Sequence, residues 1–101
     1  MTDHFNGLTP AEAERLAMLA EECAEVIQIV AKIQRHGYES FHPNDPSTTN
    51  RMLLKKELID LAAVEGQMLD WGDVRLTEQG EIGAAWKKKL RYSHHQKGSQ
   101  P

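Results

Sequence analysis

The chain has 101 residues, of which 40% are hydrophobic and 6% aromatic, and its formal net charge is −3. So few aromatic residues disfavour a β-sandwich, and the acidic balance gives no general attraction to nucleic acid or to an anionic membrane. No apolar run approaches the roughly 20 residues that span a bilayer, no signal peptide is visible, and Cys23 is a single cysteine. We therefore expect one domain over residues 1–101, in the cytoplasm, without a nucleic-acid or membrane partner.

A long first helix is predicted between Thr9 and Gly37. Thr9 is a capping residue, Pro10 suits the first helical position, and Glu12 completes a capping box. Gly37 is a typical C-terminal stop. Such a helix is about 38 Å long, which is long for a chain of this size, so we expect it to contact a partner chain as well. Residues 1–8 are expected to be a flexible leader.

The segment 37–49 contains two prolines with Asn and Asp, and it is predicted to be a loop. Its Tyr38, Phe41 and His42 allow two interpretations. The rings either cover the end of the core or form a lid or base-stacking wall beside a functional site.

A second helix is predicted to begin between Ser47 and Asn50 and to end at Trp71-Gly72-Asp73, and a third is predicted over residues 77–93. Residues 94–101 are expected to form a second flexible end. The fold class is therefore predicted to be all-α, a small bundle of three to four helices completed by oligomerisation.

Two pairs of acidic residues recur inside the predicted helices, Glu22 with Glu25 and Glu57 with Asp60. A step of three residues returns a side chain to nearly the same helix face. If the two helices lie side by side, four carboxylates converge, and a divalent cation is the usual way to hold them together. Taken singly, each pair more often faces solvent; two pairs among apolar neighbours in a short helical chain favour ligation.

Oxygen ligands of this kind favour Mg²⁺, with Mn²⁺ as the other possibility. Cys23 has no Cys or His at zinc-ligand spacing, and the chain lacks the Glu-x-x-His pairs of di-iron bundles. A metal held in this way bridges phosphate oxygens and activates water. Glu21 is a spare carboxylate for that water, although its side chain is expected to point about 100° away from that of Glu22.

The phrase Glu21-Glu22-x-x-Glu25, followed by Glu57-x-x-Asp60, resembles the MazG-like all-α nucleoside triphosphate pyrophosphohydrolases, in particular their short phage and bacterial members. The resemblance implies an enzyme that cleaves a nucleoside triphosphate between its α and β phosphates. It also implies a homodimer or homotetramer with pockets shared between subunits. The implied Mg²⁺ ligands are Glu22, Glu25, Glu57 and Asp60, with Glu21 as an auxiliary acid.

The same resemblance implies substrate contacts near Asn50, Lys87, Lys89 and Tyr92. The alternative for the lysines is a solvated basic face. The stretch between Glu25 and Glu57 is slightly longer than is usual in the family, which makes the Pro-containing loop an insertion or a substrate-specific lid.

A second functional hypothesis is a helical module of the same fold that binds a nucleotide or a protein without catalysis. A third, nucleic-acid binding, is disfavoured by the acidic balance. The residues do not distinguish one nucleotide substrate from another.

Overall fold

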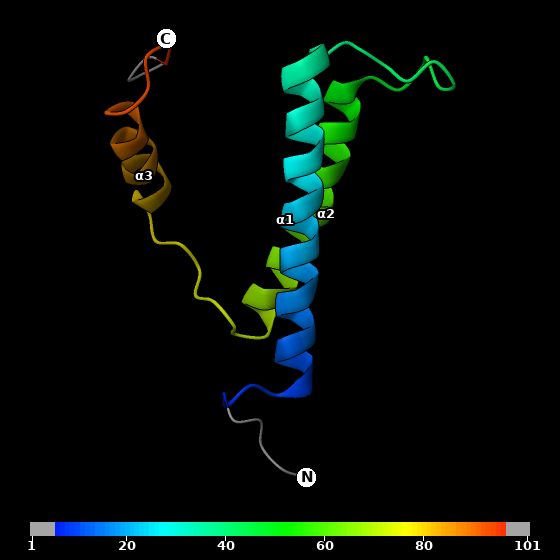
Figure 1. Cartoon of the computed structure of the whole chain (residues 1–101). Coiled ribbons are helices and arrows are strands. Elements are labelled where there is room, and N and C mark those ends of the chain that lie inside the picture. The colour runs from blue at the N-terminus through cyan, green and yellow to red at the C-terminus, as the bar shows by residue number, and fades with distance from the viewer. Residues whose placement is uncertain (1–5, 97–101) are drawn as a thin grey trace.

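The computed structural model describes residues 6–96, and in this range it is all-helical, as predicted. Its helices are α1 (Pro10–His36), α2 (Asn50–Asp70) and α3 (Glu81–Leu90) (Figure 1). These residues form no strand, and their one β-bridge is an isolated antiparallel pair between Phe41 and Thr49. None of these helices is long and apolar enough to cross a membrane. The predicted flexible ends lie partly outside the described residues.

The ends of α1 follow from local chemistry. The Thr9 hydroxyl accepts a hydrogen bond from the Glu12 backbone N–H (3.1 Å), and the Glu12 carboxylate accepts one from the Thr9 N–H (2.8 Å). Gly37 ends the helix with φ of 88°, a conformation that glycine adopts without steric cost. The predicted capping box and stop are both confirmed.

The loop between α1 and α2 is hydrogen-bonded to the start of α2. The Asn50 N–H donates to the Ser40 carbonyl (2.9 Å), and the Arg51 N–H donates to the Tyr38 carbonyl (2.8 Å). These bonds satisfy N–H groups that a helix N-terminus leaves free. The first residues of the loop are thereby held beside the first turn of α2.

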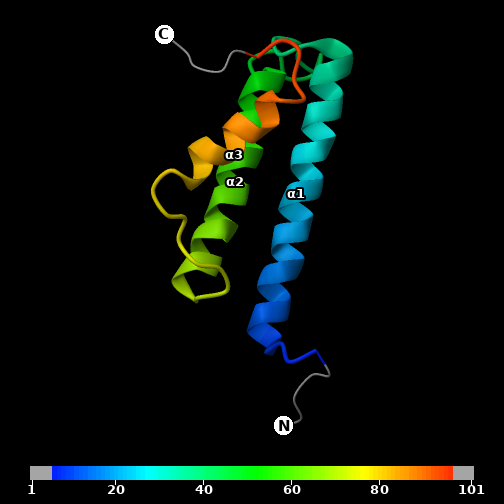
Figure 2. The same ribbon diagram turned by 90° about the vertical axis from the view of Figure 1, so that its left-hand side faces the viewer.

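α1 and α2 run antiparallel and side by side (Figures 1 and 2). The apolar side chains that are buried between them are few: Ile29, Val64 and Met68. Asn50 is the one buried polar residue of the described part. The core is therefore a thin seam between two helices, which we call the α1–α2 seam.

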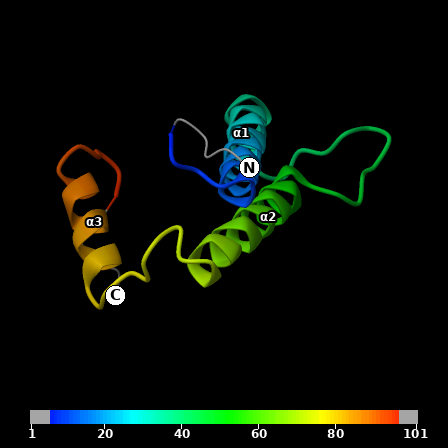
Figure 3. The ribbon, with the colours of Figure 1, turned by 90° about the horizontal axis from the view of Figure 1, so that it is seen from below.

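α3 stands apart from this pair of helices (Figures 1 and 3), and none of its Cα atoms comes within 8 Å of one in α1 or α2. It is also shorter than the predicted 77–93, because Gly80 adopts a left-handed conformation (φ 88°) immediately before it. Within one chain, therefore, the expected three-helix core is not closed: α1 and α2 form a hairpin and α3 adds nothing to its seam.

The open arrangement leaves an unusually large surface. The radius of gyration is 17.8 Å, against about 13 Å for a compact chain of 100 residues. The accessible surface is 8735 Å², against about 5,800 Å² for a compact monomer of this mass. Many large apolar side chains are exposed, among them Leu58, Ile59, Ile82 and Trp86.

One ion pair joins the segment after α2 to the first turns of α1. Arg15 donates from Nε to Asp73 Oδ2 (2.5 Å) and from Nη2 to Oδ1 (2.9 Å). Only 16% and 10% of the two side chains is exposed, and the Arg15 guanidinium lies 5.7 Å from the centre of the Trp71 ring. The hydrogen bonds from Arg15 hold the pKa of Asp73 below its ordinary value.

We expect Asp73→Asn to lower the midpoint of thermal unfolding by a few degrees at neutral pH. A depressed folded-state pKa gives stabilisation that is present above the ordinary value of about 3.9 and is lost as the pH falls through the folded value. The difference in midpoint between wild type and variant, followed by circular dichroism, should therefore shrink below about pH 4. Asp70→Asn removes the same charge from the exposed end of α2 and is the control. Equal midpoints for Asp73→Asn and wild type would contradict the prediction.

Candidate functional site

The predicted metal ligands lie on the faces that form the α1–α2 seam. All four are partly buried: Glu22, Glu25, Glu57 and Asp60. On α1, steps of three and four residues align the pair with the buried Ile29, and on α2 they align the pair with the buried Val64. The carboxylates therefore occupy positions that an ordinary helical hairpin fills with apolar side chains.

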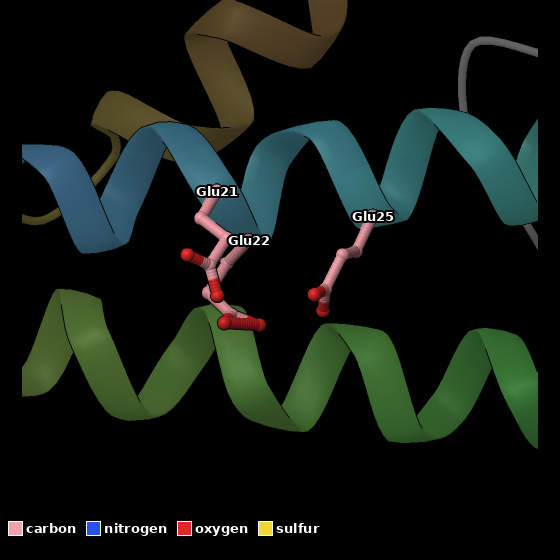
Figure 4. A group of neighbouring side chains, drawn as sticks. All are labelled: Glu21, Glu22 and Glu25. Carbon is pink, nitrogen blue, oxygen red and sulfur yellow. The ribbon is translucent and has the colours of Figure 1, made fainter.

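The carboxylates form two overlapping groups. Glu21, Glu22 and Glu25 of α1 each place one oxygen within 4.8 Å of the others (Figure 4), and so do Glu25, Glu57 and Asp60 across the seam. In Figure 4 the Glu22 and Glu25 side chains extend from α1 toward α2. Glu25 belongs to both groups, so it links the acidic residues of the two helices.

Glu21 lies closer to the cluster than its position on the helix predicts. The expected offset of about 100° from Glu22 concerns the Cα–Cβ direction. A glutamate side chain is long enough to bend across one helical step, and the exposed Glu21 carboxylate reaches those of Glu22 and Glu25. The expectation that Glu21 points away is wrong for its carboxylate group.

Mutual repulsion is visible in the electrostatics of the cluster. The negative charge of Glu22 raises the pKa of Glu25, and partial burial and the charge of Glu57 raise it further. Oε1 of Glu22 is buried without a hydrogen-bond partner, the only such side-chain atom among residues 6–96. An unpaired buried acceptor is costly. A hard cation with oxygen ligands would supply the missing partner, so the donor set fits Mg²⁺ or Mn²⁺.

A lysine neutralises part of this charge. Lys56 Nζ lies 3.0 Å from Glu57 Oε1 and 2.8 Å from Asp60 Oδ2. Its side chain is 64% exposed, whereas those of Glu57 and Asp60 are 14% and 39% exposed. The two carboxylates raise the pKa of Lys56, so the ammonium is fully charged at neutral pH.

A groove of about 410 Å³ adjoins the carboxylates and combines them with three cationic side chains. It is lined by Glu25, Gln28, Ile29, Lys32, Arg35, Leu53, Lys56 and Glu57. The acidic motifs alone did not predict that these three cations lie beside the carboxylates. The sequence does contain the pattern that indicates them. Lys32 and Arg35 follow Glu25 at steps that keep them on the same helix face, and Lys56 directly precedes Glu57.

A second hollow of about 290 Å³ lies toward the loop and shares Lys32 with the groove. Its lining is Lys32, His36, Ser40, Phe41, His42, Pro43 and Asn50. Phe41 is 50% exposed and Tyr38 46% exposed, with the Tyr38 ring 4.2 Å from the Arg51 guanidinium. Both rings are therefore about half buried, and neither the cover over the core nor the wall beside the acidic site is decided between them.

The predicted substrate contacts fall in two places. Asn50 lies in the wall of the second hollow, and its amide nitrogen donates to the Gly37 carbonyl (3.1 Å). Lys87 and Lys89 lie on α3 and Tyr92 just beyond it, and α3 stands apart from the seam. Within one chain these three residues do not line the groove.

Comparison of the chain with protein-family models, with curated proteins and with solved structures gives no match in any of the three. The resemblance to the MazG-like family therefore depends on the motif residues alone and stays a prediction. The residues that carry it are five acids, and the stretch between the third and the fourth is slightly longer than the resemblance implies: Glu21, Glu22, Glu25, Glu57 and Asp60.

With a chelator present, we expect Glu25→Gln to raise the midpoint of thermal unfolding at neutral pH. A carboxyl whose folded-state pKa is raised destabilises the fold progressively as the pH rises from its ordinary value, about 4.3, through the folded value. The increase in the midpoint of Glu25→Gln over wild type should therefore vanish below about pH 4. Glu14→Gln, at an exposed position of α1, is the matched control and should leave the midpoint unchanged. A Glu25→Gln variant less stable than wild type at neutral pH would refute the repulsion.

Proposed function

We propose that the chain is a Mg²⁺-dependent nucleoside triphosphate pyrophosphohydrolase, which releases a nucleoside monophosphate and pyrophosphate. One observation carries the proposal: partly buried carboxylates from two helices adjoin a groove with cationic side chains. Carboxylates alone repel a polyphosphate, and cations alone hold no metal. Their combination suits a ligand that is a metal complex of a polyphosphate.

Glu22, Glu25, Glu57 and Asp60 would hold the metal, and their oxygen donors accept Mn²⁺ as well as Mg²⁺. When bound, the metal supplies positive charge to the phosphate oxygens of the bond that breaks. Across the seam, oxygens of Glu25, Glu57 and Asp60 lie within 4.8 Å of one another, and Glu22 belongs to the neighbouring group with Glu25. The unpartnered Glu22 Oε1 supports this assignment, because it is an acceptor that the fold itself leaves unused.

The groove would hold the polyphosphate. Arg35 can bind a phosphate through two parallel N–H groups, and Lys32 contributes a point charge. The volume of about 410 Å³ is in the range of pockets for small ligands. Exposed Glu21, whose carboxylate lies beside those of Glu22 and Glu25, would accept the proton of the attacking water as the anhydride oxygen leaves with pyrophosphate.

The same proposal includes a homo-oligomer, a homodimer or homotetramer. The chain exposes about 3,000 Å² more than a compact monomer of its mass, an area of the size that permanent dimers bury. Leu54, Leu58, Ile59 and Ala62 form an apolar hollow on α2, with Arg51 and Lys55 at its sides. A partner chain that covers this face would also complete the thin core.

We expect Glu57→Gln and Asp60→Asn each to reduce Mg²⁺-dependent pyrophosphate release at least about 100-fold, because each removes a metal ligand. Release is measured across a panel of ribo- and deoxynucleoside triphosphates, with and without Mg²⁺. Helix content by circular dichroism should match wild type. Glu65→Gln, which removes an exposed acid of α2 outside the cluster, should retain activity.

Undiminished release by Glu57→Gln would exclude this site. Binding of a nucleotide by the wild type without pyrophosphate release would instead favour the alternative, a non-catalytic nucleotide-binding module. An absence of both binding and release would refute nucleotide chemistry altogether.

Light scattering after size exclusion should give at least twice the chain mass of 11.4 kDa. Leu58→Asp should shift the population toward the monomer, because a buried charge opposes association at an apolar face. Gln34→Asp adds the same charge at an exposed position of α1 and should leave the mass unchanged. A monomeric wild type at micromolar concentration would contradict the oligomer.

A further inference from the structure

The Lys56 ammonium lies where a bound cation would contact the acidic residues of α2. It is 3.0 Å from an oxygen of Glu57 and 2.8 Å from an oxygen of Asp60, so one charge bridges both carboxylates. The ion pair with Asp60 spans one helical turn, at i and i+4. The same two carboxylates belong, with Glu25, to the group that spans the seam.

We propose that Lys56 is the internal counter-cation of the metal-free site and competes with the metal for Glu57 and Asp60. The inference rests on the proposed metal-binding function. A divalent ion at about 2.1 Å from these oxygens would repel an ammonium that stayed at hydrogen-bond distance from them. Metal binding therefore requires the ammonium to move away.

The displaced ammonium remains in the groove. Lys56 is one of the groove's lining residues, together with Lys32 and Arg35. Its side chain is 64% exposed and flexible, so the ammonium can turn from the carboxylates toward the centre of the groove without a change in the backbone. Once the metal has replaced it at the carboxylates, Lys56 is free to contact phosphate in the groove.

The neighbouring Lys55 offers a matched control. It has the same charge and lies in the same turn of α2, yet it lines the apolar hollow formed with Leu54 and Leu58. Among the described residues it makes no ion pair. A change at Lys55 alters the net charge of the helix as a change at Lys56 does, without touching the carboxylates.

The experiment measures Mn²⁺ binding by electron paramagnetic resonance, and Mg²⁺ binding by calorimetry, in the absence of nucleotide. Lys56→Met should bind the metal about five- to tenfold more tightly than wild type, the change expected from the loss of two partly exposed ion pairs. Lys55→Met should stay within about twofold of wild type. Lys56→Gln is a second variant with the same expectation, and circular dichroism checks that both remain helical.

Equal or weaker metal binding in Lys56→Met and Lys56→Gln would overturn the inference and leave the proposed function intact. An equal gain in Lys55→Met would also overturn it, since net charge would then explain the effect. A wild-type chain that binds neither ion would overturn the inference and the proposed metal site together.

Discussion

Carboxylates of like charge lie close together in the α1–α2 seam, and this repulsion limits how the two helices pack. Carboxylates at seam positions leave room for little apolar contact, and the buried apolar side chains of residues 6–96 are only Ile29, Val64 and Met68. The repulsion raises the pKa of Glu25, and the Lys56 ammonium reduces the repulsion by bridging two of the acids. A seam of this kind stabilises the fold weakly, which is the usual cost of a functional site.

The hairpin is held at its two ends, away from the carboxylates. At one end, the loop carbonyls of Tyr38 and Ser40 accept hydrogen bonds from the first turn of α2. At the other, Asp73 beyond α2 pairs with Arg15 in the first half of α1. Contacts at both ends fix the register of α1 against α2, so the acidic side chains in the middle stay opposite each other although they repel.

The features that could be predicted from the sequence are those that depend on residues a few positions apart. The capping box of Thr9 and Glu12 and the stop at Gly37 involve residues a few positions apart, and the spacing of Glu22 and Glu25 is a property of any helix. The position of α3 was not predictable in this way, since it depends on contacts with distant residues or with another chain. Nor was the direction of Glu21, because a long side chain has several rotamers for one backbone position.

Charge also relates the groove to the carboxylate cluster, because the two share Glu25 and Glu57. The groove's lining holds two carboxylates, Glu25 and Glu57, and three cations, Lys32, Arg35 and Lys56, one of which is paired with the acids. Without a metal, the groove presents little net positive charge to a polyphosphate, and Glu21 and Glu22 repel it from one side. Under the proposed function, a divalent ion on the carboxylates would add two positive charges and free the third cation. The affinity of the groove for a triphosphate would then depend on the metal through electrostatics.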